Sequence, residues 1–333
     1  MKTLLLKIVD SLNLYPLFNR FTKNTATIFM LHGITPSGVF REGAISADVL
    51  DGFLGFLKKN NYSVLSLKEY VKALANHDKT YKSVVFTVDD GYRDFYLHAY
   101  DVFKKYNYSA TIFITSDFIE NKLFFWWDTI EFAFQTTSKT EINLDFAGMG
   151  VLRLDGNSQK KDLTDKFTRY CKTLKNAEKL AQISKLIQEL DVDITGQPKG
   201  IYEPLQWDEI AEMKENLIYF YPHTKTHPIL SRIGKDEQRV ELEVPYQVLT
   251  RKLGYNADIF CYPNGQWEDF NEDTISILKS TGYVAAVMGV EGFDHTDKPV
   301  DMFRIKRFSI PMKDMLFRQY VCGLESIKRK LLS

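Results

Sequence analysis

Short apolar runs alternate with helical patterns along most of the chain. Val84 to Val88 and Ala110 to Thr115 are almost continuously apolar, which is typical of strands buried on both faces of a parallel sheet. Between such runs, Asp48 to Asn60 and Tyr92 to Tyr106 carry apolar residues at helical spacing. This alternation predicts an α/β fold in which a parallel sheet closes into a barrel. The other expected strands are Thr27 to Leu31, Ser63 to Leu67, Leu217 to Phe220, Asp258 to Tyr262, Tyr283 to Met288 and Arg304 to Ile310.

The alternation breaks between residues 138 and 200. Ile142 to Phe146 and Val151 to Leu154 alternate like a hairpin, and Gln159 to Leu190 has helical spacing. We therefore expect a barrel over residues 26–311 that carries an inserted hairpin and helical segment at 138–200. An N-terminal amphipathic helix or extension, residues 1–25, and a C-terminal helical tail, residues 312–333, flank it. The apolar stripe of the N-terminal helix either touches a membrane surface through residues 1–20 or packs on the domain.

Composition narrows the class of partner. The 43 basic and 43 acidic residues cancel, so no electrostatic footprint favours nucleic acid. The three cysteines are widely spaced, which indicates neither a disulfide framework nor a zinc ribbon. No stretch has the length of a transmembrane span, and no signal-peptide cleavage site follows the N-terminal segment. These features predict a cytoplasmic protein, with any membrane contact peripheral, and they leave the oligomeric state open.

Two adjacent carboxylates follow one of the apolar expected strands. Asp89 and Asp90, with Gly91, come directly after Val84 to Val88. The C-terminal ends of parallel barrel strands are where active sites of such folds lie. The alternative interpretation is a simple turn, because Asp-Gly is common turn chemistry and an Asp after a strand often caps the next helix.

A pair of histidines provides the second candidate site. His223 and His227 are four residues apart, so on a single helical turn, begun by Pro222 and ended by Pro228, both imidazoles could reach one metal ion. They follow the expected strand Leu217 to Phe220, so they too lie at a strand end. Two histidines and one carboxylate would leave coordination positions open for water and substrate, as in catalytic zinc sites. The carboxylate left over could take a proton from the water.

These motifs resemble those of the polysaccharide deacetylases, carbohydrate esterase family four, whose NodB-like domain is a distorted (β/α)7-type barrel. The family motif TFDDG corresponds to Thr87-Val88-Asp89-Asp90-Gly91, and H-(S/T)-x-x-H corresponds to His223-Thr224-Lys225-Thr226-His227. The resemblance extends over residues 26 to 311. It implies that Asp89 is the general base, that Asp90, His223 and His227 hold a divalent metal, and that Thr224 braces the metal loop by hydrogen bonding. Zinc is the expected ion, with cobalt or nickel as alternatives.

The chain departs from the family pattern in two places. The third motif usually carries Arg where this chain has Cys261, although Pro263 and Gly265 are retained. The Asn264 amide would still be offered to a developing oxyanion. The late Leu-x-His segment that supplies the family's general acid is not found. His295, the only histidine after His227, is therefore the candidate acid. Arg307 on the last strand either orients Asp89, polarises substrate or is a surface charge.

Residues near the expected strand ends complete the predicted site. We expect substrate contacts from polar and aromatic side chains at the barrel mouth, namely His32, Tyr92, Trp126, Trp127, Thr224, Tyr262 and Pro263, each of which could instead be structural. The function expected is metal-dependent hydrolysis of N-acetyl groups on an amino-sugar glycan. Two alternatives remain open: an O-acetyl esterase, whose alcohol leaving group depends less on an acid, and a carbohydrate-binding protein without turnover.

Overall fold

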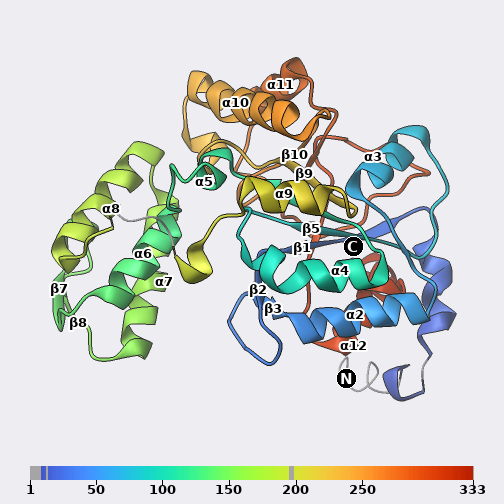
Figure 1. The fold of residues 1–333 in the computed structure, drawn as a ribbon, viewed down its shortest axis with the longest axis horizontal. Helices are drawn as coiled ribbons and strands as arrows, with labels where there is room; N and C mark the ends of the chain where they lie inside the picture. Colours follow the sequence, from blue (N-terminus) through green and yellow to red (C-terminus); the bar gives the residue numbers. More distant parts are fainter. Residues whose placement is uncertain (1–8, 13, 195–198, 333) are drawn as a thin grey trace.

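A parallel six-stranded sheet forms the centre of the protein (Figure 1). The computed structural model describes residues 9–12, 14–194 and 199–332. The strand order is β12-β1-β5-β6-β9, and β4 pairs with the start of β5. The strands are β1 (Ala26–Leu31), β4 (Ser63–Val64), β5 (Ser83–Val88), β6 (Ala110–Ile114), β9 (Ile218–Pro222) and β12 (Phe308–Ser309). Strands β5 and β6 are buried along their whole length, as their apolar sequences predict.

A second parallel pair continues the curve of this sheet. Strand β10 (Ile259–Cys261) pairs with β11 (Ala285–Val287), and Val287 forms a parallel bridge with Ile305. Three residues later, Phe308 pairs with Phe29 of β1. One C-terminal segment therefore contacts both β11 and β1, which explains why only Phe308–Ser309 of the expected strand Arg304 to Ile310 is regular. The arrangement confirms the predicted α/β fold with a distorted barrel.

Helices cover both sides of the sheet in Figure 1. Helices α2 and α4 lie on one side, and α10 and α11 lie on the other. The helices of the barrel are α2 (Ala47–Lys59), α3 (Leu67–Asn76), α4 (Tyr100–Tyr106), α5 (Ser116–Ile119), α9 (Trp207–Lys214), α10 (Lys235–Leu253) and α11 (Glu272–Thr281). Short elements complete it: β2 (Gly33–Thr35), β3 (Ala44–Ser46), the π-helical turn η2 (Phe95–Ala99), and the 3-10 turns η4 (Gly200–Tyr202) and η5 (Leu230–Arg232).

Two expected elements differ in extent. The predicted strand Ser63 to Leu67 stops after Val64, because Ser66 caps the following helix. Its Oγ accepts the Glu69 amide at 3.2 Å, while its own amide donates to Glu69 Oε2 at 2.7 Å, a capping box that starts α3 at Leu67. The predicted helix Tyr92 to Tyr106 begins only at Phe95, and its first turn is π-helical.

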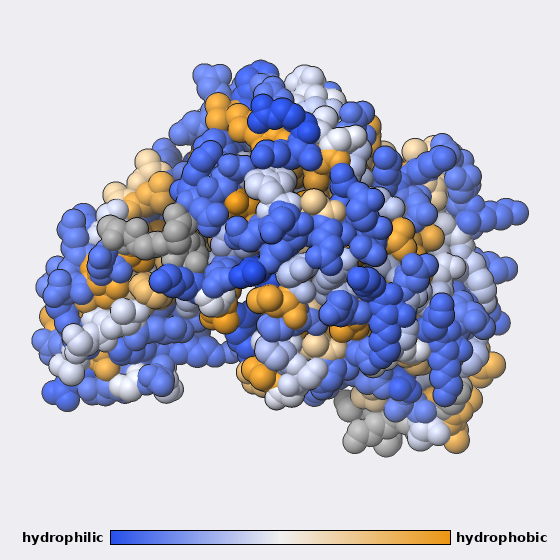
Figure 2. Space-filling view, viewed as in Figure 1, coloured by the Kyte–Doolittle hydropathy of each residue, from blue (hydrophilic) through white to orange (hydrophobic). Residues whose placement is uncertain are grey.

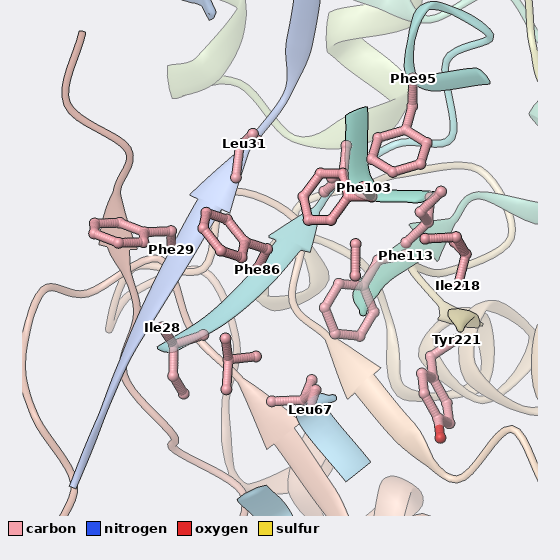
Figure 3. Packing of buried hydrophobic residues seen from close by; sticks show 14 of the residues in the cluster. Ile28, Phe29, Leu31, Leu67, Phe86, Phe95, Phe103, Phe113, Ile218 and Tyr221 are labelled. Atoms are coloured by element: carbon pink, nitrogen blue, oxygen red, sulfur yellow. The ribbon is translucent and has the colours of Figure 1, made fainter. Parts of the chain in front are cut away.

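The main hydrophobic core fills the space between the sheet and the helices of the barrel (Figure 3). Phe29 and Phe86 lie side by side on neighbouring strands with ring centroids 5.8 Å apart. Phe86 meets Phe103 of α4 edge to face at 5.4 Å. Burying one such ring contributes about 1.5–3 kcal/mol, so this cluster fixes the strand ends that carry the polar residues.

The segment around residues 138–200 forms a lobe beside the barrel (Figure 1). It contains β7 (Glu141–Asn143) and β8 (Val151–Arg153), which pair as an antiparallel hairpin, with the turn η3 (Asp145–Ala147), α7 (Asn157–Thr173) and α8 (Asn176–Leu190). Helix α6 (Trp126–Thr136) joins them, since Ile130 and Phe134 pack with Phe167 and Leu186 in a separate core. The lobe therefore has its own hydrophobic core and enters the site through the first turn of α6.

The two ends of the described chain pack together. The 3-10 helix η1 (Tyr15–Thr22) lies against α12 (Asp314–Val321) and α13 (Leu324–Leu332), and Cys322 packs with Val9 and Tyr15. Most of the predicted N-terminal apolar stripe, Leu4, Leu5 and Ile8, lies outside the described residues, and its last member, Leu12, is exposed. Within the described ranges, no helix combines the length and apolar character that a membrane crossing requires.

Candidate active site

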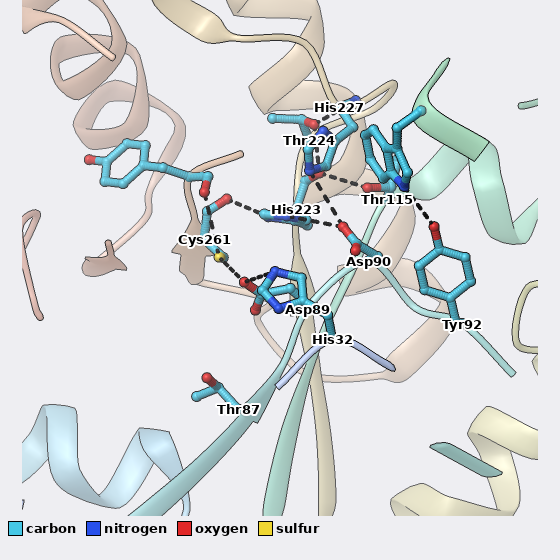
Figure 4. Close-up of polar contacts among 12 residues, drawn as sticks. His32, Thr87, Asp89, Asp90, Tyr92, Thr115, His223, Thr224, His227 and Cys261 are labelled. Atoms are coloured by element: carbon cyan, nitrogen blue, oxygen red, sulfur yellow. Dashed lines mark hydrogen bonds and ion pairs between the residues drawn. The ribbon is translucent and has the colours of Figure 1, made fainter. Parts of the chain in front are cut away.

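Three strand ends bring the polar residues of the site together (Figure 4). His32 follows β1, Asp89 and Asp90 follow β5, and His223 follows β9. Backbone bonds hold the ends in register: the Asp89 amide donates to the Leu31 carbonyl at 3.0 Å. Because all these strands are parallel, their C-terminal ends meet at one edge of the sheet.

Asp90, His223 and His227 form a compact triangle of metal-type ligands. Asp90 Oδ1 lies 3.5 Å from His223 Nε2 and 3.4 Å from His227 Nε2, and all three side chains are buried. Burial lowers the pKa of His223 to about 4, and burial with the neighbouring His223 holds the pKa of His227 well below its usual range. Both imidazoles are therefore neutral near pH 7, as metal coordination requires.

Hydrogen bonds test whether this triangle suits a metal ion. His223 Nδ1 lies 2.8 Å from the Cys261 carbonyl, to which it can only donate, so its Nε2 lone pair faces Asp90. Burial and the nearby Asp89 carboxylate raise the pKa of Asp90 well above its usual range, a cost that a bound cation would remove. Two imidazole nitrogens and one carboxylate match the donor set of a divalent transition metal, and the remaining coordination positions would be open.

The loop between the two histidines is not helical, so the prediction of a helical turn from Pro222 to Pro228 was wrong. Pro222 is the last residue of β9, and Thr224 and His227 have positive φ angles of 64° and 61°. Thr224 Oγ1 accepts the His227 amide at 2.9 Å, which replaces a helical bond with a side-chain bond. The Glu241 side chain of α10 accepts the amides of Lys225 and Thr226, at 2.9 and 2.8 Å. Thr224 is fully buried, so the predicted substrate contact is wrong, while the predicted brace has the required geometry.

Asp89 is held by a buried arginine from the far end of the sequence. Arg307 donates from Nη1 to Asp89 Oδ1 at 2.7 Å and from Nη2 to Oδ2 at 2.8 Å, a bidentate pair in which both side chains are buried. Although burial opposes ionisation, the Arg307 charge holds the pKa of Asp89 well below its usual range. Cys261 lies beside the pair, 3.1 Å from Arg307 Nη2. Of the three roles considered for Arg307, the geometry fits orientation of Asp89.

His32 lines the same pocket as the metal-type triangle. Its Nε2 is 3.8 Å from Asp89 Oδ2, and its side chain is 50% exposed, whereas Asp89 is 3% exposed. The imidazole therefore opens onto the pocket while remaining next to the buried acid. An exposed imidazole in this position can exchange protons with solvent and with a bound substrate.

A pocket of about 570 Å³ lies above these groups. Aromatic residues line one side of it: Tyr92, Trp126, Trp127 and Tyr202. Trp127 Nε1 donates to Tyr92 OH at 3.1 Å, and Tyr92 OH donates to Asp128 Oδ2 at 2.7 Å. Burial raises the pKa of Asp128 to about 7. These bonds link helix α6 to Tyr92, the residue after Asp89-Asp90-Gly91. Tyr92, Trp126 and Trp127, which were predicted to contact substrate, all line the pocket.

The third motif contributes one residue to the pocket instead of three. Asn264 is exposed to the pocket, and among the described residues no acceptor pairs with its amide. Tyr262 is 1% exposed, stacks on Phe270 and donates its hydroxyl to the Phe303 carbonyl, and Pro263 is also buried. The predicted substrate contacts of Tyr262 and Pro263 were therefore wrong, because these side chains point into the core. Gly265 is required here, since a Cβ would lie 2.5 Å from the Gly289 amide.

His295 lies at the wrong end of the sheet for a general acid. It forms an antiparallel bridge with Thr25, directly before β1, whereas His32 and Asp89 follow the ends of β1 and β5. The six residues of β1 separate the two positions by about 20 Å at 3.3 Å per residue. The prediction that His295 supplies the acid was wrong. The signal that identified the Asp pair, a polar residue directly after an apolar strand, also points to His32.

Comparisons with known proteins agree on one family. A model of the polysaccharide deacetylases matches residues 76–142 and 161–286, over half of the chain. A putative polysaccharide deacetylase of Bacillus subtilis, YxkH, is 35% identical over 96 residues, which are 28% of this chain and 33% of that protein. The match thus spans about a third of the length of that relative.

Solved structures show the same fold at low sequence identity. IcaB from Ammonifex degensii has a TM-score of 0.59 at 15% identity, with 90% of this chain and 97% of that chain covered. The Streptococcus pyogenes deacetylase PplD, solved in complex with acetate, has a TM-score of 0.57 at 20% identity, with 87% and 93% covered. The structures show the fold, and the family model, which matches over half of the chain, shows that the chain belongs to the polysaccharide deacetylase family.

Proposed function

We propose that this protein removes acetyl groups from N-acetylated amino sugars of a glycan, with a divalent metal, zinc in the first instance, held by Asp90, His223 and His227. One observation carries the proposal. Asp89, fixed by Arg307, lies beside this ligand triangle at the base of a pocket large enough for sugar as well as acetyl. PplD was solved with acetate bound, and another solved structure of this fold is a de-N-acetylase from Aggregatibacter actinomycetemcomitans, which fits the same chemistry.

A metal bound at the triangle would polarise the amide carbonyl and acidify a bound water. Asp89 would accept the proton of the attacking water. The two Arg307 bonds keep the carboxylate ionised and aimed, but they also lower its basicity, so Asp89 depends on a water that is already acidic. The Asn264 amide is free to donate to the carbonyl oxygen as negative charge develops there.

His32 is our candidate for the acid that protonates the leaving nitrogen. It lines the pocket, is half exposed and lies beside Asp89. An amine leaves readily only when it is protonated, so a histidine here favours amide over ester hydrolysis. This removes the reason for preferring an O-acetyl esterase, which rested on the apparent lack of an acid.

The test compares metal-free protein with protein loaded with zinc, cobalt or nickel. Acetate release would be measured on N-acetylated chitooligosaccharides and on matched O-acetylated glycans. We expect metal-stimulated release from the N-acetylated substrates. Release from O-acetylated glycans alone would identify an esterase, and glycan binding without any release, unaffected by Asp89→Asn, would identify a binding protein.

A further inference from the structure

Three cations lie at the seam between the lobe and the barrel, beside the pocket. Lys172 lines the pocket from α7, the helix whose Phe167 and Cys171 pack in the lobe core. Arg232, five residues after His227, donates from Nη1 to the carbonyl of Thr173 at 2.6 Å, the residue next to Lys172. Lys179 of α8 acts electrostatically on both Cys171 and Arg232. In the space-filling view the outline is notched where the lobe meets the barrel (Figure 2).

These cations differ from the other basic residues of the pocket. Arg41 pairs with Asp94, and Lys161 pairs with Glu42 across the pocket. By contrast, the described part of the chain offers no carboxylate in ion-pair contact with Lys172, Lys179 or Arg232. Of the basic side chains in the pocket and at its edge, Arg41 and Lys161 are therefore paired with carboxylates, whereas, within the ranges described, Lys172, Lys179 and Arg232 are not.

Lys179 is buried, so its unpaired ammonium group has lost hydration without gaining an ion pair. It is 3% exposed, and its Nζ lies 4.8 Å from the ring centroid of Trp126, a pocket-lining residue. Burial lowers the pKa of Lys179 to about 8, so the amine is still mostly protonated near pH 7. The Trp126 ring offsets only part of the lost hydration, and a nearby anion would offset more.

The carboxylate of Asp269 lies near the cluster. Asp269 is 8% exposed, accepts the Gln266 amide at 2.8 Å and is influenced by the charges of Arg232 and Lys172. Glu268 is also close enough to act on Asp269, but within the described residues neither carboxylate forms an ion pair with the three bases. Five acids line the pocket. Glu42 and Asp89 pair with cations, Asp128 accepts the Tyr92 hydroxyl, Glu131 accepts a hydrogen bond from Gln135, and Asp90 lies in the ligand triangle.

We propose that this seam binds an anionic group of the glycan, a phosphate or a carboxylate, so that the preferred substrate is an acidic glycan carrying an N-acetyl sugar beside the charge. Lys172 and Arg232, which are exposed, would contact the anion. Lys179 would add positive potential from behind Trp126. The inference rests on the proposed deacetylation and deepens it by naming the substrate class.

The test uses the full chain loaded with zinc and three N-acetylglucosamine oligosaccharides of similar length: neutral, phosphate-bearing and uronate-bearing. The kcat/KM for acetate release should be about tenfold higher on a charged oligosaccharide, as two accessible charge contacts would give, and the advantage should shrink with added salt. Preference for phosphate alone or for uronate alone identifies the group, and preference for both indicates a general anion subsite.

A paired variant with a matched control separates this subsite from a general effect of charge. Lys172→Gln combined with Arg232→Gln should lower the ratio of charged to neutral kcat/KM about tenfold, mainly through KM. Lys166→Gln, on the same helix but paired with Asp162, should leave that ratio as in the parent. Both changes are at exposed positions, and thermal melts would verify folding.

Failure of this inference differs from failure of the proposed function. Equal kcat/KM on neutral and charged oligosaccharides, or a charge preference that the paired variant retains, overturns the anion subsite while deacetylation stands. Absence of acetate release from all three substrates overturns the deacetylation on which the subsite depends.

Discussion

Polar residues gather at both ends of strand β1, but only those at the C-terminal end face a pocket. At the N-terminal end, Thr25 Oγ1 and Tyr70 OH both donate to the Asp294 carbonyl at 2.7 Å, and Thr25 bridges His295. At the C-terminal end, His32 and Asp89 face a pocket. The first end satisfies its hydrogen bonds with backbone partners, as a stabilising face does. The second keeps buried charges beside open volume, which is where parallel barrels place chemistry.

The largest effect on activity should come from the carboxylate at the pocket end. Asp89→Asn removes the proton acceptor but leaves Asp90, His223 and His227 in place. We expect acetate release to fall about 10³-fold, within the usual range for general bases, while elemental analysis still finds bound metal. Loss of metal along with activity would instead place Asp89 among the ligands and contradict the division of roles within the Asp pair.

The second prediction compares the histidines at the two ends of β1 directly. His32→Gln should lower kcat on N-acetylated substrate about 10²-fold, because the leaving amine loses its proton donor. His295→Gln, at the opposite end, should leave kcat close to the parent value. The loss in the His32 variant should be smaller on an O-acetyl ester, whose leaving group needs less protonation. Equal losses in both histidine variants would remove His32 from the reaction.

The residues at the pocket end could be predicted from the sequence because each directly follows an apolar run. Each candidate on a strand end, including Asp90 and His223, is where an apolar run stops, and burial of both sheet faces makes that boundary visible. The Asp89–Arg307 pair spans 218 residues, so only the folded barrel shows that the guanidinium meets this carboxylate. The role predicted for His295 was wrong because the sequence alone did not show that the chain after β11 passes the N-terminal end of β1.

The histidine loop shows a second limit of local reasoning. An i, i+4 pair matches a helix, and Pro222 and Pro228 match its ends, yet the loop is held by Thr224 and by Glu241 of a distant helix. Tertiary bonds therefore override a spacing that a helix would also satisfy. The two imidazoles still meet, so the predicted ligand set has the required geometry although the predicted backbone was wrong.

The third prediction concerns the ion pair beneath the pocket. Arg307→Met would leave Asp89 buried and unpaired, which should lower the free energy of unfolding by about 3–5 kcal/mol. In the parent, the depressed pKa of Asp89 stabilises the fold above the carboxyl's ordinary range, and this is lost only in strong acid. In the variant, unopposed burial raises that pKa, so activity should fall as pH decreases through a higher range.

The pH profile and a double variant distinguish the loss of the Asp89–Arg307 ion pair from a simple loss of packing. Asp89→Asn in the Arg307→Met background should recover part of the unfolding free energy, because no buried charge remains. Denaturant unfolding of the four proteins gives the coupling. If the double variant is as unstable as the sum of the single changes, Arg307 stabilises the fold by packing and not through Asp89.

The smallest predicted effect lies at the N-terminal end of β1 and concerns stability alone. Tyr70→Phe removes a buried hydroxyl that also accepts the Ala26 amide at 3.2 Å, so this N–H loses its partner. We expect a loss of about 1–3 kcal/mol in denaturant unfolding with kcat/KM unchanged, because the change lies a full strand length from Asp89. Tyr81→Phe, at a half-exposed ring, is the matched control and should change stability by less than about 0.5 kcal/mol. A fall in kcat/KM for Tyr70→Phe in fully folded protein would show that the two ends of β1 are coupled, and the separation of a stabilising end from a reactive end would not hold.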